Sequence, residues 1–321
     1  MTTDRRETTP ALTPAGRAGV PWVAVVTFVV LACGLAWLAV LPLWLGEGLA
    51  SPLATVFITL MMVTPALATV IVMGVFRTPG APRARALGMA PLRPLGRFFL
   101  FLGIGLIAPI VVVVATIAVS AAFGLVELDL VEFSGFAAQI SSASAGAPLP
   151  PIIVLVIVQI VAIPVGALVN SVLAFGEELG WRGWLHGALL PLGAWPTVLI
   201  TGAVWGLWHA PVILLGYNFA RPDGTGLAFM VGGCVAWGVL LGWLRLRSAS
   251  LWPAVLAHGS LNAVGGLILV FVAVGETPDL AVVGPLGLVA WAIIAVMVVV
   301  IVAARQFRSG VVAPATSEAP R

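Results

Sequence analysis

The sequence predicts an all-α, polytopic membrane protein with about eight transmembrane helices, and three observations lead to this prediction. Hydrophobic residues make up 61% of the chain and charged residues only 8%, whereas soluble domains contain roughly 25% charged residues. The apolar residues lie in runs of about 20 or more, the length that an α-helix needs to cross about 30 Å of hydrocarbon. These runs lack the polar/apolar alternation of transmembrane β-strands. Spanning helices are therefore expected.

Eight apolar segments are the candidates for these helices, and together they predict one membrane domain over residues 21–304. Polar tails precede and follow it, at residues 1–20 and 305–321. The first apolar run continues for about 25 residues without a small-residue cleavage site, which is typical of an uncleaved first span. The expected spans cover about 21–45, 51–76, 98–123, 151–175, 196–217, 225–244, 249–273 and 281–304.

The arginines predict how these spans are oriented. With eight spans, all the arginine-bearing segments fall on one side: the N-terminal tail, the 77–97 loop, the residues after the sixth span and the C-terminal tail. The alternate loops carry mainly Asp and Glu. Because positively charged loops stay in the cytoplasm, we expect both termini to be cytoplasmic. The Pro/Ser/Gly/Ala-rich stretch around 134–150 is then expected to be an external loop.

The composition also indicates the membrane and the partners. A chain rich in Ala, Gly, Val and Arg, without lysine, is typical of a GC-rich bacterial genome, so the expected location is the inner (plasma) membrane of a bacterial cell. Arginines near the cytoplasmic leaflet are attracted to anionic lipid. The expected partner of the basic segments is therefore the lipid bilayer, and no nucleic-acid partner is expected. The sequence does not determine the oligomeric state.

Ionisable residues within or beside the apolar spans are few, and they occur in three places. They are Glu177, Glu178, Arg182 and His186 around the end of the fourth span, His209 in the fifth, and His258 with Asn262 in the seventh. A charged side chain in hydrocarbon costs about 2.5–3.5 kcal/mol and usually faces a cavity. A single histidine can instead hydrogen-bond a carbonyl and hold helices together, and His186 is the first candidate for such a bland role. Three helices with polar groups favour one shared intramembrane polar cavity.

Helical spacing assigns roles to these side chains. Glu178 and Arg182 are four residues apart and are expected to form an ion pair on one helix face. Glu177 is turned by about 100° from Glu178, which leaves it free to act as a general base. Trp205 and His209 share a face in the same way, so the indole is expected to limit rotation of the imidazole.

The pair His258 and Asn262 completes a site that can hydrolyse an amide bond. These two residues are also four apart, and together they offer two directed donors for a developing oxyanion. Glu177 and His209 would share the attacking water, and no serine, threonine or cysteine with a matched base is evident. With Glu177 near the cytoplasmic face, and the histidines very roughly 14–20 Å deep at 1.5 Å per residue, the cavity is expected to open to the cytoplasm.

At these residues the sequence resembles the CAAX-protease and bacteriocin-processing (CPBP, or Abi) family of intramembrane proteases. The resemblance rests on Glu177-Glu178-x-x-x-Arg182, then Trp205-x-x-x-His209, then His258-x-x-x-Asn262, over about residues 150–265. It implies a glutamate-dependent endopeptidase that cleaves a membrane-associated protein or peptide at a site open to the cytosol. Glu177 and His209 would activate water, His258 and Asn262 would bind the oxyanion, and Glu178, Arg182 and Trp205 would support them. Trp205 departs from the phenylalanine common at its position, which bears on pocket shape.

Other functions stay open alongside the glutamate protease. No cofactor is expected, but two histidines and a glutamate also suit a catalytic zinc ion, and Glu177, His209 and His258 would then be the ligands. The HExxH spacing is absent, and Cys33 and Cys234 lie inside apolar runs, away from any metal motif. A proton-coupled transporter would also use intramembrane Glu and His, but it would usually carry them in paired repeats. A non-catalytic bacteriocin-immunity or scaffold protein is the remaining alternative.

Overall fold

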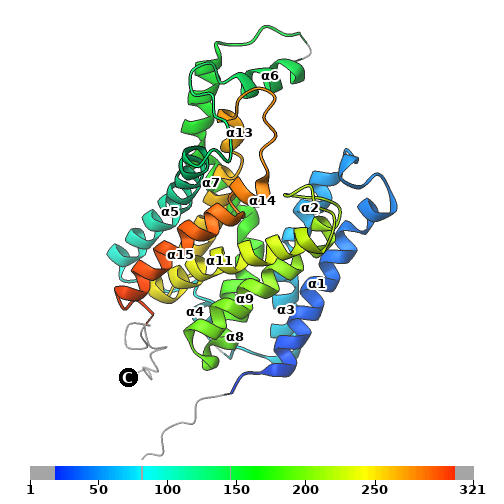
Figure 1. Ribbon diagram of the computed structural model, residues 1–321. Helices are drawn as coiled ribbons and strands as arrows, with labels where there is room; N and C mark the ends of the chain where they lie inside the picture. The colour runs from blue at the N-terminus through cyan, green and yellow to red at the C-terminus, as the bar shows by residue number, and fades with distance from the viewer. Residues whose placement is uncertain (1–18, 81, 145, 308–321) are drawn as a thin grey trace, which may run out of the picture.

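A computed structural model describes residues 19–80, 82–144 and 146–307 of the chain. Over these residues the protein is helical, and the one extended pairing is an isolated bridge between Leu128 and Val272. The all-α prediction is therefore confirmed (Figure 1). The tails expected at 1–20 and 305–321 lie almost wholly outside the described residues.

Seven helical stretches of the described chain are long and apolar enough to cross a membrane, so the protein is an integral membrane protein, as predicted. Their components and the shorter helices are α1 (Trp22–Leu45), η1 (Gly48–Ala50), α2 (Ala54–Met62), α3 (Thr64–Phe76), α4 (Arg83–Ala86), α5 (Leu95–Ala122), α6 (Ser134–Ala143), α7 (Ile152–Glu178), η2 (Leu179–Leu185), α8 (His186–Leu189), η3 (Leu190–Leu192), α9 (Ala194–Trp208), α10 (Ala210–Ile213), α11 (Gly224–Ser248), α12 (Trp252–Val264), α13 (Ile268–Phe271), α14 (Leu280–Val283) and α15 (Leu288–Ala303).

The predicted fifth span is the one that differs in length. The apolar run predicts a helix over 196–217, but α9 has 15 residues and ends at Trp208, which gives it about 22 Å at 1.5 Å per residue. The chain leaves the helix because the His209 backbone N–H bonds to Gly206 O, one residue closer than in an α-helix. Pro211, which has no N–H to offer, follows in α10. All eight predicted segments are thus helical, and seven qualify as spans.

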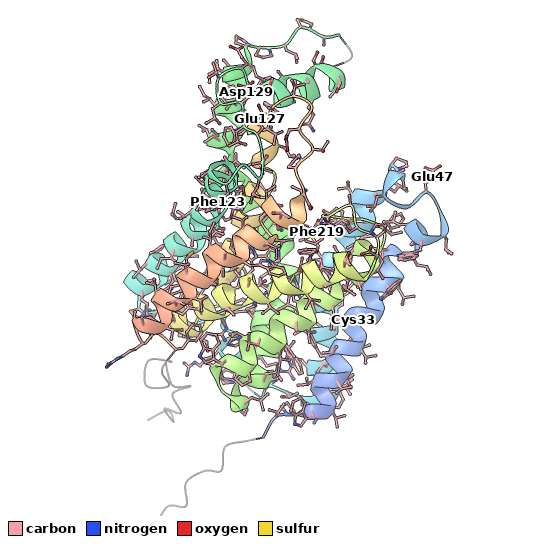
Figure 2. All side chains as sticks on the ribbon, in the orientation of Figure 1. Cys33, Glu47, Phe123, Glu127, Asp129 and Phe219 are labelled. Atoms are coloured by element: carbon pink, nitrogen blue, oxygen red, sulfur yellow. The ribbon has the colours of Figure 1, made fainter. Side chains whose placement is uncertain are left out.

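Apart from Arg221, which lies with the acids, the charged residues at the helix ends and in the connections separate onto two opposite faces. We call the first the arginine face and the second the acidic face. The arginine face carries Arg77, Arg83, Arg85, Arg93, Arg97, Arg245, Arg247 and Arg305, and the acidic face carries Glu47, Glu127, Asp129, Glu132, Asp223, Glu276 and Asp279. In Figure 1 the start of α1, α4 and the end of α15 lie in the lower half of the molecule. Figure 2 shows Glu47, Glu127 and Asp129 in the upper half.

Hydrogen bonds hold the segments of the arginine face together. Arg245 Nη2 donates to Ala86 O at 3.2 Å, and Leu251 N donates to Gly88 O at 2.8 Å. Arg97 also donates to the carbonyl of Arg247. The loop after α3 therefore packs on the α11–α12 connection, as expected if both lie on one side. That this side is cytoplasmic stays a prediction from the positive-inside rule.

The stretch around 134–150, predicted as a loop, contains a short helix instead. Helix α6 covers its first ten residues and buries Phe136. It packs against α13, and Gly135 permits this because a Cβ there would lie 2.4 Å from Val272 O. The segment lies between two spans, as predicted for a loop, and its first ten residues form this short helix.

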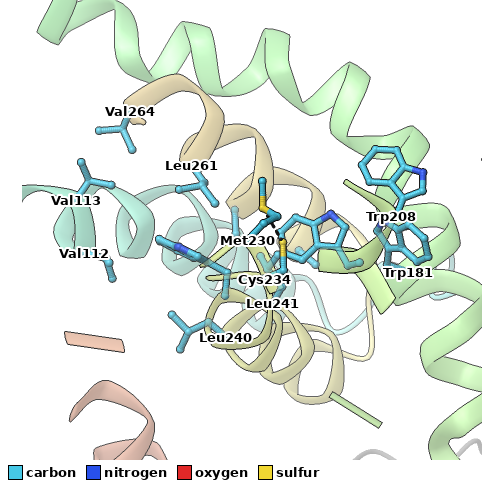
Figure 3. Close-up of a cluster of buried hydrophobic side chains, with 14 of the residues drawn as sticks. Val112, Val113, Trp181, Trp208, Met230, Cys234, Leu240, Leu241, Leu261 and Val264 are labelled. Carbon is cyan, nitrogen blue, oxygen red and sulfur yellow. Dashed lines mark hydrogen bonds between the residues drawn. The ribbon is translucent and has the colours of Figure 1, made fainter. Parts of the chain in front are cut away.

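The core depends on close contacts between helices. Helix α12 packs against α5 and α7, and α9 packs against α11. Glycine makes the second contact close, because a Cβ on Gly206 would lie 2.5 Å from Val231 Cα. Small residues at helix interfaces are a general device of membrane proteins. Around these contacts, side chains of α5, η2, α9, α11 and α12 form the buried cluster in Figure 3, where Trp181 meets Trp208 edge to face at 5.9 Å.

We predict that Gly206→Ala lowers the free energy of unfolding by about 1–3 kcal/mol, the range for overpacking a core. The new methyl group would have to push α9 away from α11. Gly103→Ala in α5 is the matched control, since nothing lies within 4 Å of its Cβ position. Thermal unfolding in detergent, followed by tryptophan fluorescence, measures both. Equal melting temperatures for the two variants would contradict the close contact.

Candidate active site

The fourth predicted span ends in a widened helical turn that carries the acidic pair. Glu177 and Glu178 are the last residues of α7, and η2 continues the chain as a π-helix, a conformation frequent at functional sites. Glycines on either side bring this turn against the break between α2 and α3. A Cβ on Gly176 would lie 2.8 Å from Met62 O, and one on Gly180 would lie 2.6 Å from Pro65 Cβ. The two carboxylates are therefore held deep in the protein.

Glu178 is the centre of a buried charge cluster. Its Oε1 accepts hydrogen bonds from Arg182 Nη1 at 2.7 Å and from His258 Nδ1 at 2.9 Å. The predicted pairing of Glu178 with Arg182 is confirmed, and the pair is 0% and 1% exposed. The contact with His258, which lies 80 residues away in the chain, joins α7 to α12. The other carboxylate oxygen of Glu178, Oε2, and the Arg182 Nη2 atom are buried without a hydrogen-bond partner, so this pair carries part of its desolvation cost uncompensated.

Glu177 points to a different neighbour, as its helical position predicts. Its Oε2 accepts a hydrogen bond from Trp205 Nε1 at 2.8 Å, and the residue is 2% exposed. The Arg182 guanidinium lies over the Trp205 ring, 4.6 Å from its centre. Trp205 therefore contacts both Glu177 and Arg182. A phenylalanine at this position would lack the indole N–H that donates to Glu177.

His209 is fixed by the irregular end of α9. Its Nδ1 lies 2.9 Å from the carbonyl oxygen of Trp205. That carbonyl is free for the imidazole because the His209 backbone N–H bonds to Gly206 instead. The predicted contact of the ring with Trp205 is confirmed at 5.9 Å between centres, and Trp208 lies closer, at 4.7 Å.

These side chains come together at one cavity of about 700 Å³. Glu177, Trp205, His209, His258 and Asn262 all line it. Glu178 and Arg182 lie behind this wall, where they contact His258 and Trp205. The catalytic candidates and their predicted supports thus form one site, and all of them except His209 and Trp205 belong to segments that qualify as spans.

His186 is the polar residue of the motif region that the site does not include. It is buried, 3% exposed, and it does not line the cavity. A Cβ on Gly242 would lie 3.7 Å from its Cε1, so it faces α11. Neither of its ring nitrogens has a hydrogen-bond partner among the described residues, so the expected bond of His186 to a carbonyl is absent, and the ring packs on α11 outside the cavity.

The cavity also contains residues that sequence spacing did not indicate. Tyr217, the single tyrosine of the chain, lines it from the α10–α11 connection. Cys234 lines it from α11, with Sγ 3.9 Å from His209 Nδ1. Neither residue belongs to a spaced motif, and only the rarity of tyrosine and cysteine in this chain could have drawn attention to them.

The cavity runs from Glu177 to the acidic face. Beyond the site its wall is made by Leu49, Ala54, Tyr217, Phe219, Leu280, Pro285 and Leu286, which all lie at the acidic-face ends of helices. Phe219 is visible in the upper half of Figure 2. The prediction that the cavity opens on the same side as the arginine-bearing loops was therefore wrong. The reason is that η2 and α8 continue the fourth span past Glu177, so that Glu177 lies within the helical segment Ile152–Leu192 and not at its end.

The zinc alternative requires three ligands at one point. Over the described residues, no group of three His, Cys, Asp or Glu side chains is arranged to hold a metal ion. One Glu177 oxygen bonds to Trp205, and the Nδ1 atoms of His209 and His258 bond to Trp205 O and Glu178, which leaves the other Glu177 oxygen and both Nε2 atoms as the donors that a zinc ion would use.

The segment that contains this site is similar to a known protein family. Residues 149–264 match the model described as type II CAAX prenyl endopeptidase Rce1-like. Over these residues the chain is similar to that family. The match covers α7 to α12 and includes every residue predicted for the site, so the predicted CAAX-protease resemblance is confirmed. A search of curated proteins finds no match. At the level of the family, the Rce1-like match supports a protease of the CAAX type acting in the membrane.

We predict that Arg182→Met destabilises the fold by about 3–5 kcal/mol, because it leaves the Glu178 carboxylate buried with one partner fewer. The double variant Glu178→Gln, Arg182→Met removes both charges and should be closer to wild type. Chemical unfolding in mixed detergent micelles measures the difference. A double variant no more stable than Arg182→Met would show that the ion pair is not what holds this turn.

Proposed function

We propose that the protein is an intramembrane endopeptidase that hydrolyses a peptide bond of a membrane-associated protein or peptide by direct attack of water. One observation carries the proposal: Glu177 of α7, His209 at the end of α9, and His258 and Asn262 of α12 line a single cavity. Buried polar groups at membrane depth are costly unless they serve a function. The Rce1-like match supports the same class of reaction.

His209 is suited to accept a proton from water. A backbone carbonyl can only accept a hydrogen bond, so Nδ1 of His209 must carry the hydrogen that bridges to Trp205 O. In the neutral imidazole, Nε2 is then an unprotonated acceptor. The local end of α9 thus selects the tautomer that a general base needs.

Glu177 is suited to share that water. The Trp205 indole holds one carboxylate oxygen, and the other is available to accept a hydrogen bond in the cavity that Glu177 lines. A fixed carboxylate beside a fixed imidazole positions the water between two acceptors. General bases of this kind contribute about 10²–10⁴-fold to a rate.

His258 is suited to the oxyanion. Its Nδ1–H donates to the ionised Glu178, which fixes the ring as a carboxylate fixes the histidine of a catalytic triad. A doubly protonated His258 would donate through Nε2, and its charge would balance the buried groups: two carboxylates against Arg182 and the imidazolium. Asn262, one helical turn further along α12, supplies an amide donor. Donors preorganised in this way stabilise the tetrahedral oxygen.

The proposed reaction balances with water alone. The water oxygen bonds to the carbonyl carbon while its proton passes to Glu177, with His209 as the second acceptor. The carbonyl oxygen becomes the oxyanion held by His258 and Asn262. Collapse of this intermediate breaks the C–N bond, and the leaving amine takes the proton from Glu177. No covalent enzyme intermediate and no cofactor enter the proposal.

The cavity wall supports an apolar, membrane-associated polypeptide as substrate. Apart from the site residues, about half of the wall is formed by Leu, Ile, Met, Val and Phe side chains, with Thr55, Thr59, Asn170 and Asn218 among the polar residues. A peptide segment with apolar side chains would replace water along it, and binding energy would come from the apolar area removed from water. The bilayer is the second partner in this proposal.

We predict that Glu177→Gln abolishes cleavage, while the fold is kept because the glutamine amide oxygen still accepts from Trp205. Cleavage of a membrane-delivered peptide library in detergent, read by mass spectrometry, measures activity with and without a chelator. Glu132→Gln, an exposed change on the acidic face, is the control.

Each outcome of that assay bears on one alternative. Cleavage by wild type alone, insensitive to chelator, supports the glutamate mechanism, and loss of cleavage with chelator would favour zinc. Equal cleavage by Glu177→Gln would remove Glu177 from its role as base. A biological effect that survives Glu177→Gln would favour the scaffold or immunity alternative.

We predict that Trp205→Phe lowers kcat by about 10–100-fold with little change in KM, since a hydrogen bond to a charged group is worth about 1.5–3 kcal/mol. The ring that packs on Arg182 and His209 is retained in this variant. Trp184→Phe is the matched control, because it also deletes a buried indole donor, to Thr78 O at 2.9 Å, but away from the cavity. Equal losses in both variants would mean that the effect is structural.

A further inference from the structure

The site is closed toward the arginine face. Trp181, Arg182, Trp184 and Leu185, which follow Glu178 in η2, are each at most 2% exposed. Arg245 Nε donates to Arg182 O at 3.1 Å, and Trp184 Nε1 donates to Thr78 O. The segments that contain Thr78 and Arg245 are thus hydrogen-bonded to the buried residues of η2, which close the site on this side. Among the described residues, none of the 77–97 loop or the 245–251 connection lines the cavity.

The site is open toward the acidic face. From Glu177 the wall continues along Leu173 and Asn170 of α7, and α7 begins at the acidic face. From His258 it continues along α12 to Gly265 and Gly266, again in the direction of the acidic face. The mouth is formed by three connections, which contain Leu49, Tyr217 and Leu280.

An ion pair links two of the connections that form the mouth. Arg221 of the α10–α11 connection donates to both carboxylate oxygens of Asp279, at 2.9 and 2.7 Å. This contact lowers the pKa of Asp279 below its ordinary value. Arg221 is the single arginine of the acidic face in the described chain, and it is paired across the mouth. The net charge around the entrance therefore stays negative.

The charge distribution indicates which face of the protein lies in the cytoplasm. The described part of the arginine face contains no Asp or Glu, and the acidic face contains seven acids and Arg221. Under the positive-inside rule such an asymmetry puts the arginine face in the cytoplasm. The cavity mouth then lies on the other side.

We propose that this cavity opens on the extracytoplasmic side of the membrane and receives its polypeptide from there. On the proposed function, the substrate class is a polypeptide whose cleavable bond is presented at the outer surface or in the outer half of the bilayer. Polypeptides that expose the cleavable bond only to the cytoplasm would not reach the cavity, because the buried residues of η2 close that side.

Thiol labelling in cells tests the orientation. In a background of Cys33→Ala and Cys234→Ala, which removes both native cysteines, Tyr217→Cys places a probe at the mouth and Ala84→Cys places one in exposed α4 on the arginine face. A charged, membrane-impermeant maleimide is added to bacterial spheroplasts before and after permeabilisation. We expect labelling of the Tyr217→Cys protein in intact spheroplasts, and of the Ala84→Cys protein only after permeabilisation. Any other pattern overturns the proposal.

Cleavage by the wild-type chain tests the entry side. A membrane-tethered peptide library is presented to the outside of intact spheroplasts, and to the purified enzyme in detergent. Cleavage in both supports the proposal. Cleavage in detergent but not in spheroplasts overturns external entry. If neither is cleaved, the proposed protease function fails, while the labelling result, which needs no activity, still decides the orientation.

Discussion

The arrangement of the site depends on the cost of burying charge. Glu178 and Arg182 are almost completely removed from solvent, and neither could stay there alone. Their pairing fixes the end of α7 and the start of η2, and the bond from His258 to Glu178 then sets the position of α12. The stacking of Arg182 on Trp205 sets the position of α9. Three helices are thus aligned around one ion pair, and the cavity is the space that this alignment leaves.

The parts of this structure that sequence could predict are those set by spacing along one helix. The pairing of Glu178 with Arg182, the release of Glu177 from that pair and the contact of Trp205 with His209 all follow from helical geometry. The bond from Trp205 to Glu177 does not, because it joins residues 28 positions apart through the packing of α9 on η2 and α7. His258 was expected to act with Asn262, and its bond to Glu178 depends on the packing of α12 against α7 in the same way.

Two larger features also lay outside what hydropathy can show. The apolar run over 196–217 continues past His209, so composition gives no sign that α9 stops at Trp208. The direction of the cavity depends on how far the fourth span continues beyond Glu177. That continuation, through η2 and α8, contains Trp181, Arg182, Trp184 and His186, and such a polar and aromatic stretch reads as an interface when only composition is considered. Packing against α11 and the 77–97 loop makes it interior.

The early end of α9 has an electrostatic consequence for His209. An α-helix carries a partial negative charge at its carboxyl end, worth about 0.3–1 kcal/mol to a nearby cation and up to about 2 kcal/mol where it is partly buried. His209 is the C-cap of α9 and bonds directly to one of its last carbonyls. In the proposed reaction, the dipole of the whole helix would therefore stabilise the partial positive charge that develops on the imidazole as it shares the water with Glu177. A helix that continued across the membrane would have placed that negative end at the acidic face, away from His209.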